Sequence, residues 1–451
     1  MDPPDSRGEY TVCNRRSCGG EFCLARLCAP RPRGGGMRIG RRESVEDPET
    51  SWRRPLYLLW LSNFIAVLGL NFQWSFIPLY LPHLGVTSTR AVGVWSGAIM
   101  AVTPLVAAIT GPLWGNFADK HGRRRVVIQV YLANIFIIGA MGFVHQPWQL
   151  FILRILQGAL GGVAAASLSL VTSITPADRL GSALGLYQTS NFTAAAIGPF
   201  FGGLLADLVS IRFPYVLLGA LNVVAALLVW LGVAEPSGVR PVGRGAEQGF
   251  FGKIWTLVRR PGLLSLAMTG AMVQFGVVVI APVIPLFVRH LLGDSRFVGT
   301  VTGLLVALAG VAGSVSAVVA GQLGDRYGHR RLLVFMCIGA AIVFGWTGTA
   351  ETIVQLIALR TAAGLFIGGL LPTSNALIGQ LVSESERGTA FGMTTSFQMM
   401  GTVLGPLVGG ALGTTLGFSS VFWTTMVVFF LTALWVYGSG RRQAGREELG
   451  T

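Results

Sequence analysis

Charged residues are scarce in this sequence of 451 residues. Only 12% of them are Asp, Glu, Lys or Arg, whereas 52% are hydrophobic. A soluble domain carries about twice that share of charge, so the composition excludes an ordinary globular protein. The mean hydropathy of +0.62 points the same way. The chain is therefore expected to be a helical membrane protein that crosses the bilayer many times.

Patterns for catalysis or metal binding are also missing. The chain contains no P-loop, no cluster of metal ligands and no convincing Ser-His-Asp arrangement. Every Asp and Glu falls in a tail, in a polar loop or at the end of an apolar run, with Asp207 nearest to an exception, and no His lies in the middle of such a run. We therefore expect no enzyme activity, no cofactor and no metal site. A carboxylate that could carry a proton within the membrane is not displayed.

Cysteine is rare and unevenly placed. Four of the five cysteines run from Cys13 to Cys28 at a uniform spacing of five, in a polar, arginine-rich segment. This spacing lacks the C-x-x-C pairs that make a zinc site specific. The residues before Met37 are either a disordered extension or a start assigned too far upstream, or they form a zinc or redox sensor. Cys337 lies in an apolar run and is expected to be a packed core residue.

Long apolar runs, in contrast, are abundant. Each is long enough for a helix that crosses a bilayer, which needs about 20 residues. They cover residues 55–82, 92–115, 126–145, 148–173, 181–207, 213–233, 263–289, 297–320, 331–349, 353–381, 388–415 and 419–438. The pattern predicts an all-α membrane protein with twelve transmembrane helices. Its parts are an N-terminal extension (1–54), a first half (55–233), a polar linker (234–262), a second half (263–438) and a tail (439–451).

The two halves repeat one loop sequence. GNFADKHGRRR begins at Gly115 and GQLGDRYGHRR begins at Gly321, each between two apolar runs. Gly115 and Gly321 allow a neighbouring helix to approach closely, and the second glycine of each copy can take the positive φ of a turn. The aspartate can pair with the arginines or cap a helix start. The gating residues expected here are Gly115, Asp119, Gly122, Arg123, Arg124, Gly321, Asp325, Gly328 and Arg330.

Other pairs extend the repeat beyond this loop. Pro78 corresponds to Pro285, Arg154 corresponds to Arg360, and GPFFGG from Gly198 corresponds to GPLVGG from Gly405. The separations are 206 or 207 residues throughout. Two six-span halves of this kind form a parallel repeat, and such folds place the substrate between the halves near the midplane of the bilayer.

The basic residues predict how the chain is oriented. The formal net charge of +14 would suggest nucleic acid for a soluble protein, but here the topology accounts for it. If both termini are cytoplasmic, Arg154 and Arg360 lie within spans and nearly all other Lys and Arg residues face the cytoplasm. The exceptions on the outer side are Arg90, Arg212, Arg289 and Arg296. This bias follows the positive-inside rule and predicts a multi-pass protein of the cell membrane.

Arg154 is the clearest candidate for a functional residue inside the membrane, because a charge in the hydrocarbon is costly and by default marks a site. Arg154, Gln157 and Gly158 share one face of a helix through their i, i+3 and i+4 spacing. The same face continues through Gly161 and Gly162. Arg154 either acts in the transport mechanism or is a structural arginine that binds carbonyl groups of a neighbouring helix. Arg360, where Ala363 replaces the glutamine, is its counterpart.

The repeated G-x-x-x-D-x-x-G-R-[RK] loop resembles that of the major facilitator superfamily, and residues 51–438 resemble its twelve-span drug:proton antiporter group. The resemblance implies two pseudo-symmetric six-helix bundles, the major facilitator fold. It also implies a coupling role for Arg154, Gln157, Gly158 and Arg360, and an antiporter motif formed by Gly198, Pro199, Gly202, Gly203, Gly405 and Pro406. In the fuller form of this motif a glycine is expected where this chain has Ala194.

Few polar residues are available to line a substrate cavity. The candidates are Asn71, Gln73, Trp74, Gln188, Asn191, Gln274, Asn375 and Gln398. The expected function is proton-coupled efflux of small amphipathic compounds such as drugs, driven by the proton gradient and carried out by a monomer in the lipid bilayer without nucleic acid. The alternatives are a metabolite permease or facilitator of the same fold, or a sensor that no longer transports.

Overall fold

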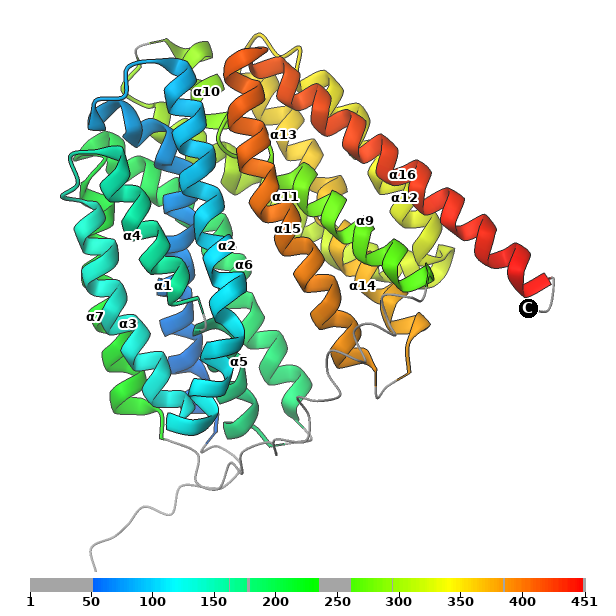
Figure 1. The fold of residues 1–451 in the computed structure, drawn as a ribbon, viewed down its shortest axis with the longest axis horizontal. Coiled ribbons are helices and arrows are strands. Elements are labelled where there is room, and N and C mark those ends of the chain that lie inside the picture. The colour runs from blue at the N-terminus through cyan, green and yellow to red at the C-terminus, as the bar shows by residue number, and fades with distance from the viewer. Residues whose placement is uncertain are drawn as a thin grey trace, which may run out of the picture. The chain divides into compact units, whose positions relative to one another are not determined.

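The computed structural model describes residues 52–161, 163–176, 179–234, 261–293, 295–383 and 386–448, which are mostly helical (Figure 1). Cys13 to Cys28 and nearly all of the expected linker lie outside the described residues. The elements are α1 (Arg53–Tyr80), η1 (Leu81–Leu84), α2 (Thr89–His121), α3 (Arg123–Met141), α4 (Pro147–Ala159), α5 (Val163–Ile174), α6 (Leu180–Leu208), α7 (Phe213–Gly232), α9 (Pro261–Val278), α10 (Ile284–Leu292), α11 (Val298–Tyr327), α12 (His329–Thr347), α13 (Ile353–Ile367), α14 (Leu370–Leu381), α15 (Arg387–Thr415) and α16 (Phe418–Glu448).

Within the described ranges, eight helical segments are long and apolar enough to cross a membrane. They are Arg53–Leu84, Thr89–Gly111, Arg123–Met141, Phe213–Gly232, Val298–Tyr327, His329–Thr347, Ile353–Leu381 and Phe418–Ser439. Helices α6 and α15 have 29 residues each but are not among them. Their sequences are rich in Gly and in Ser or Thr, which lowers their hydropathy. The protein is therefore a helical, multi-pass membrane protein.

Three of the expected spans are interrupted. The apolar run 148–173 contains α4 and α5, the run 263–289 contains α9 and part of α10, and the run 353–381 contains α13 and α14. The break between α9 and α10 falls at residues 279–283, which contain Pro282 and precede Pro285 in the first turn of α10. Proline lacks the backbone N–H that a continuous helix needs. The break between α13 and α14 falls at Gly368 and Gly369, which have low helix propensity.

Each half of the chain has its own apolar core. In the first half, α3 packs against α7, and α1 packs against both α6 and α7. In the second half, α12 packs against α16, and α15 packs against α9. Tyr131 and Leu170 belong to the buried cluster of the first half, and Phe344 and Phe429 belong to that of the second. Burial of these side chains stabilises each half.

The halves contact each other mainly through two pairs of helices, α6 with α11 and α2 with α15. A further apolar cluster brings Phe76 and Tyr80 of the first half together with Leu286 of the second. This cluster lies at the end of the helices that carries Gly85 and Gly293, which we call the outer end.

The two copies of the repeated loop have the same backbone geometry. Gly122 ends α2 with φ 95° and ψ 132°, and Gly328 ends α11 with φ 91° and ψ 124°. Residues other than glycine rarely adopt such a positive φ. The prediction that these two glycines turn the chain between helices is confirmed.

Candidate functional site

Helices α6 and α11 approach so closely at the outer end that only glycine fits between them. A Cβ atom added to Gly203 would overlap the carbonyl oxygen of Gly299. One added to Gly303 would overlap the carbonyl oxygen of Pro199. A backbone atom cannot rotate away as a side chain can. The predicted antiporter motif therefore lies at a direct contact between the halves, which we call the α6–α11 seam.

The same contact occurs a second time with the halves exchanged. A Cβ atom on Gly93 of α2 would lie 2.5 Å from the carbonyl oxygen of Gly410, and one on Gly97 would lie 2.6 Å from that of Pro406. Gly410 and Pro406 are the repeat counterparts of Gly203 and Pro199. This second contact is the α2–α15 seam, and the two seams reproduce the sequence repeat in three dimensions.

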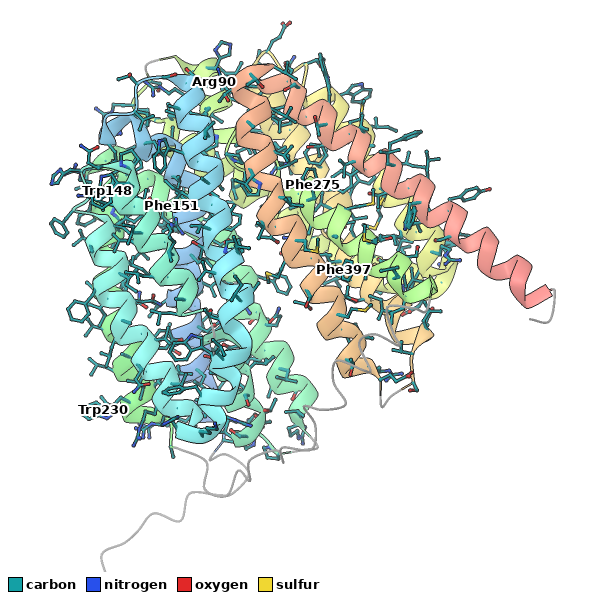
Figure 2. All side chains as sticks on the ribbon, viewed as in Figure 1. Arg90, Trp148, Phe151, Trp230, Phe275 and Phe397 are labelled. Carbon is teal, nitrogen blue, oxygen red and sulfur yellow. The ribbon has the colours of Figure 1, made fainter. Side chains whose placement is uncertain are left out.

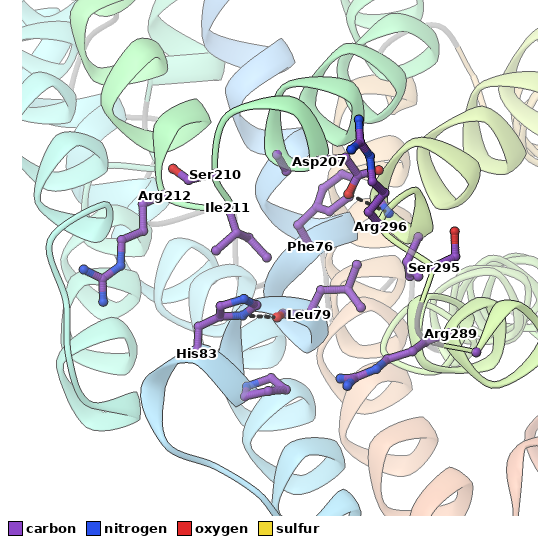
Figure 3. A pocket seen from close by; sticks show the side chains of 15 residues that line it. Phe76, Leu79, His83, Asp207, Ser210, Ile211, Arg212, Arg289, Ser295 and Arg296 are labelled. Carbon is purple, nitrogen blue, oxygen red and sulfur yellow. Dashed lines mark hydrogen bonds between the residues drawn. The ribbon is translucent and has the colours of Figure 1, made fainter.

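The α6–α11 seam contains a carboxylate that joins the halves (Figure 3). Asp207, at the end of α6, accepts hydrogen bonds from the backbone N–H of Gly299 (3.1 Å) and from the N–H (2.5 Å) and hydroxyl (2.8 Å) of Thr300. Helix α11 starts at Val298, so these N–H groups have no partner within the helix. Asp207 thus caps a helix of the other half, and its negative charge favours the positive helix start.

The α2–α15 seam has no such bond at the matching position. Thr414 is the repeat counterpart of Asp207, and its hydroxyl donates to the carbonyl groups of Gly410 (2.9 Å) and Ala411 (3.1 Å) in its own helix. Its methyl group packs where a Cβ of Gly93 would lie. The two seams are alike in their glycines but differ in charge.

The other motif glycines pack within their own half. A Cβ on Gly202 would overlap the ring of Phe72, and one on Gly198 would lie 3.0 Å from the carbonyl oxygen of Leu68. In the second half, a Cβ on Gly405 would lie 3.1 Å from the nitrogen of Val279. Pro199 and Pro406 both lie inside continuous helices. The motif therefore holds α6 and α15 against neighbours on two sides.

A cavity of about 750 Å³ opens beside Asp207 at the outer end. Figure 3 shows the side chains of His83, Asp207, Arg289 and Arg296 around it. Arg212 also lines the cavity, and it donates to the carbonyl oxygen of Val144 (3.3 Å). Three of the four basic residues expected on the outer side therefore border one cavity next to the contact between the halves.

Arg154 is wholly buried in the first half. Its exposed fraction is 0%, and its guanidinium donates to the side-chain oxygen of Gln157 (3.1 Å). Two other guanidinium nitrogens have no hydrogen-bond partner among the described residues. Thr103 of α2 donates to the carbonyl oxygen of Arg154 (3.2 Å), and Gly158 packs on the backbone of the same threonine. Arg154 thus contacts Gln157, three residues along the same helix, deep inside the bundle.

Arg360 has a similar position in the second half, with 9% of its surface exposed. The guanidinium carbon lies 5.7 Å from the centre of the Phe344 ring. Its Nε and one Nη have no partner among the described residues. An aromatic face compensates a cation only in part. Both halves therefore enclose an arginine for which the described ranges provide no carboxylate.

The repeated loops differ in their polar contacts. Arg123 donates to the carbonyl oxygen of Ser169 (3.1 Å), and Arg124 donates to the carbonyl groups of Val229 and Trp230. Nothing is described of the side chain of Asp119 or the surroundings of Gly115.

In the second copy, the exposed Asp325 lies 3.2 Å from His329 Nε2, one turn along the chain. Its charged partner among the described residues is thus a histidine, and neither of the two roles considered for this aspartate, pairing with the arginines or capping a helix start, is tested by this contact. Around Gly321 there is open space, although this glycine was expected to allow a close approach between helices.

A group of amides lies between α1 and α6. Asn63 donates to the side chains of Ser190 (2.7 Å) and Asn191 (3.0 Å), and Asn191 donates to Gln188 (2.9 Å). Trp60 donates to Thr189 on the same stretch (2.8 Å). Two of the expected cavity residues, Gln188 and Asn191, are therefore linked to each other and to α1.

The counterpart in the second half is different. The repeat places Gly270 where the first half has Asn63, and the Nε2 atom of Gln398 lies 3.2 Å from the position of its Cβ. The side chain of Gln398 therefore lies against the backbone of α9 at Gly270, whereas that of Asn191 lies against the side-chain amide of Asn63.

The remaining cavity candidates line neither of the two cavities found among the described residues. Asn71 donates to the carbonyl oxygen of Val67 in its own helix (2.9 Å), and Gln73 is buried with 0% exposure and no partner among the described residues. Trp74, Gln274 and Asn375 are partly buried. The Cβ of Gln274 lies 3.2 Å from where a Cβ on Gly401 would be.

Comparison with known proteins identifies the family. Residues 59–345 and 279–450 match the Major Facilitator Superfamily. The chain belongs to this superfamily. It is 32% identical to multidrug resistance protein MdtG of Escherichia coli O81 (strain ED1a) over 398 residues, which is 88% of this chain and 97% of that protein. It is 33% identical to MdtG of Serratia proteamaculans (strain 568) over 397 residues, which is 88% and 96% of the two chains.

Solved structures share the fold of this transporter. One is a bacterial homologue of the human lysosomal transporter Spinster in an inward-facing and occupied conformation. It has a TM-score of 0.73 and 15% identity, and the match covers 88% of this chain and 98% of that one. The chain is thus a transporter of the major facilitator type and not an enzyme, and it resembles the multidrug efflux group.

The structure shows a role for two residues of this transporter that the sequence did not single out as site residues. Asn63 lies in an otherwise apolar run, where one amide looks like packing, and Asp207 looks like an ordinary loop residue at the end of a span. Asn63 binds α6 more than 120 residues away, and Asp207 binds α11 more than 90 residues away. The isolated carboxylate in a chain poor in charge was the one available signal for Asp207.

Proposed function

We propose that this transporter exports small amphipathic compounds by alternating access in exchange for protons, as a monomer with twelve spans and both termini in the cytoplasm. The observation that carries the proposal is the pair of equivalent seams. Each half supplies one G-P-x-x-G-G segment to a glycine contact with the other half, so that the two bundles meet backbone against backbone at the outer end. Small residues let such surfaces separate and rejoin without repacking large side chains.

In this conformation the halves are joined at the outer end, which the charge count assigns to the exterior. We propose that it represents the state closed to the outside, with Asp207 holding the α6–α11 seam. Opening would then require Gly299 and Thr300 to exchange the Asp207 carboxylate for water. The bond contributes to one state only, which is what a switch between two states requires.

The chemistry of the interior supports a class of substrate. Two buried arginines make the interior positive, and burying an unpaired cation beside them would be costly. Met399 and Met400 on α15 are exposed and offer adaptable apolar contacts. Neutral, zwitterionic or anionic amphipathic compounds are therefore the expected substrates, in preference to permanently charged cations.

The test is accumulation in cells that lack their own efflux pumps. Cells that express the chain should retain less of an uncharged or acidic drug than cells without it, and a protonophore should abolish the difference. A quaternary ammonium dye of similar size should be retained equally by both. Uptake of the drug down its concentration gradient, at a rate that the protonophore does not change, would indicate a passive facilitator instead. Export of the dye alone would contradict the electrostatic argument.

A further inference from the structure

A second cavity, of about 390 Å³, lies at the other end of the first half, between the start of α3 and the end of α7. Figure 2 shows Trp230 at this end of α7. The cavity is lined by His121, Arg124, Arg125, Ile128, Gln129 and Trp230. It shares no lining residue with the cavity beside Asp207, and Arg124 is its one lining residue that belongs to the expected gating residues.

The polar side of this cavity is positively charged. Arg124 is fixed by hydrogen bonds to the carbonyl groups of Val229 and Trp230, and Arg125 is exposed at the rim. The ring of His121 stacks on Phe117 with ring centres 4.1 Å apart. Helix α3 begins beside the cavity, and a helix start carries partial positive charge. Its first turn contains no acidic residue to offset this charge. The described lining contains no carboxylate, so the cavity favours an anion.

The cavity continues into apolar surface along both helices. On α3, Leu132 and Phe136 follow Arg125 on one face, with exposed fractions of 46% and 75%. On α7, Leu227 and Trp230 are also exposed. Helices α3 and α7 pack against each other and against helices of the first half, so these side chains lie on the outside of the bundle, where lipid chains surround it.

We propose that this cavity binds the phosphate of an anionic phospholipid, with an acyl chain along the apolar faces of α3 and α7. Guanidinium groups bind phosphate oxygens through several hydrogen bonds at once, and basic pockets between helices on the cytoplasmic side suit acidic headgroups. Free phosphate offers the same anion but uses none of the apolar surface. The combination of a charged pocket and exposed apolar walls therefore favours the lipid.

The second half provides a matched control. Arg331 is the repeat counterpart of Arg125 and is also exposed, but the second copy has Tyr327 in place of His121 and Phe335 in place of Gln129. The two arginines of the lining are thus repeated, but its other polar side chains, His121 and Gln129, are not. Replacing Arg331 removes the same charge from the same side of the protein at a position without this lining.

The experiment measures lipid bound to the purified full-length protein in detergent by native mass spectrometry. Dioleoyl phosphatidylglycerol should bind in preference to dioleoyl phosphatidylcholine and to the short-chain dihexanoyl phosphatidylglycerol. Arg125→Gln should weaken binding of dioleoyl phosphatidylglycerol about tenfold, the loss expected for one charge-assisted contact. Arg331→Gln should leave it unchanged. Arg125→Lys keeps the charge and should retain most of the binding.

Several results would overturn the proposal. Equal binding by the parent and Arg125→Gln would remove the site. An equal loss in Arg331→Gln would show general attraction to basic surface. Inorganic phosphate that displaces the lipid at equal concentration, or short-chain lipid that binds as well as long-chain lipid, would show a phosphate site without a lipid groove. If Arg125→Gln elutes as an aggregate, the loss of binding in Trp230→Ala, tested with the same lipids, decides instead.

Discussion

The role of Asp207 gives the sharpest prediction. Asp207→Ala removes the acceptor of three hydrogen bonds that join α6 to α11 and leaves two N–H groups of the α11 start without a partner. Removal of a capping side chain costs about 0.5–2 kcal/mol, and the negative charge with its three bonds places this case near the upper end. A cost of about 2 kcal/mol, borne only by the state that is closed at the outer end, lowers its population relative to the open state about thirtyfold.

The assay is the distance between spin labels on the two halves. Thr87 and Glu351 are exposed, lie at the outer ends of different halves, and can be labelled after conversion to cysteine in a variant whose own cysteines are replaced by serine. In Asp207→Ala the distance distribution should move towards larger values. Asp207→Asn keeps one acceptor oxygen and should give a smaller shift in the same direction.

The control is Thr414→Val, because Thr414 occupies the matching position in the other seam and donates only within its own helix. The distances should not change in this variant. An unchanged distribution in Asp207→Ala would refute the proposal that this carboxylate holds the halves together. An equal shift in Thr414→Val would show that any change at the seams has the same effect.

The other predictions concern the seams, the buried arginine and the topology. Gly303→Val should abolish transport, because its side chain would overlap the Pro199 backbone. Gly310→Ala on the same helix should retain activity, because the nearest atom to its Cβ lies 3.6 Å away. Drug accumulation in cells measures both, and an active Gly303→Val would contradict the close α6–α11 seam. Arg154→Met should keep or raise the melting temperature, since replacing a poorly paired buried charge by an apolar side chain is often neutral or stabilising by about 1–4 kcal/mol. The same variant should lose export. A strongly destabilised but active variant would assign Arg154 a structural role. Single cysteines at Ser237 and Ser295 should react with impermeant reagents from opposite sides of the membrane, and reaction from the same side would rule out the twelve-span topology.

Much of the architecture follows from local sequence. Apolar runs of sufficient length predict helices, and the repeated loop predicts the positive φ of Gly122 and Gly328, because these features depend on a few neighbouring residues. The interruptions of three spans are less visible, since proline and glycine also occur inside continuous helices here, as Pro199 and Pro406 show. Whether such a residue breaks a helix depends on what packs around it.

The contacts between the halves depend on residues far apart in the chain. The motif Gly198 to Gly203 predicts close packing but not its partner, and only the fold shows that Gly203 meets Gly299 whereas Gly202 meets Phe72. The burial of Arg154 is a similar case. Its helical face could be read from the spacing, but its enclosure inside the first bundle depends on where the neighbouring helices lie. Contacts between residues that are far apart in the chain leave no periodic signal in the sequence.

The difference between Asp207 and Thr414 has a consequence for the path of opening. Two halves that descend from one repeat would separate evenly if both seams were equally strong. Here the α2–α15 seam is held by close packing around its glycines and Thr414. The α6–α11 seam adds the Asp207 cap, whose cost of about 2 kcal/mol corresponds to a preference of about thirtyfold. We therefore expect α2 and α15 to part first and the halves to turn about the α6–α11 line, so that a leaving substrate passes between α2 and α15.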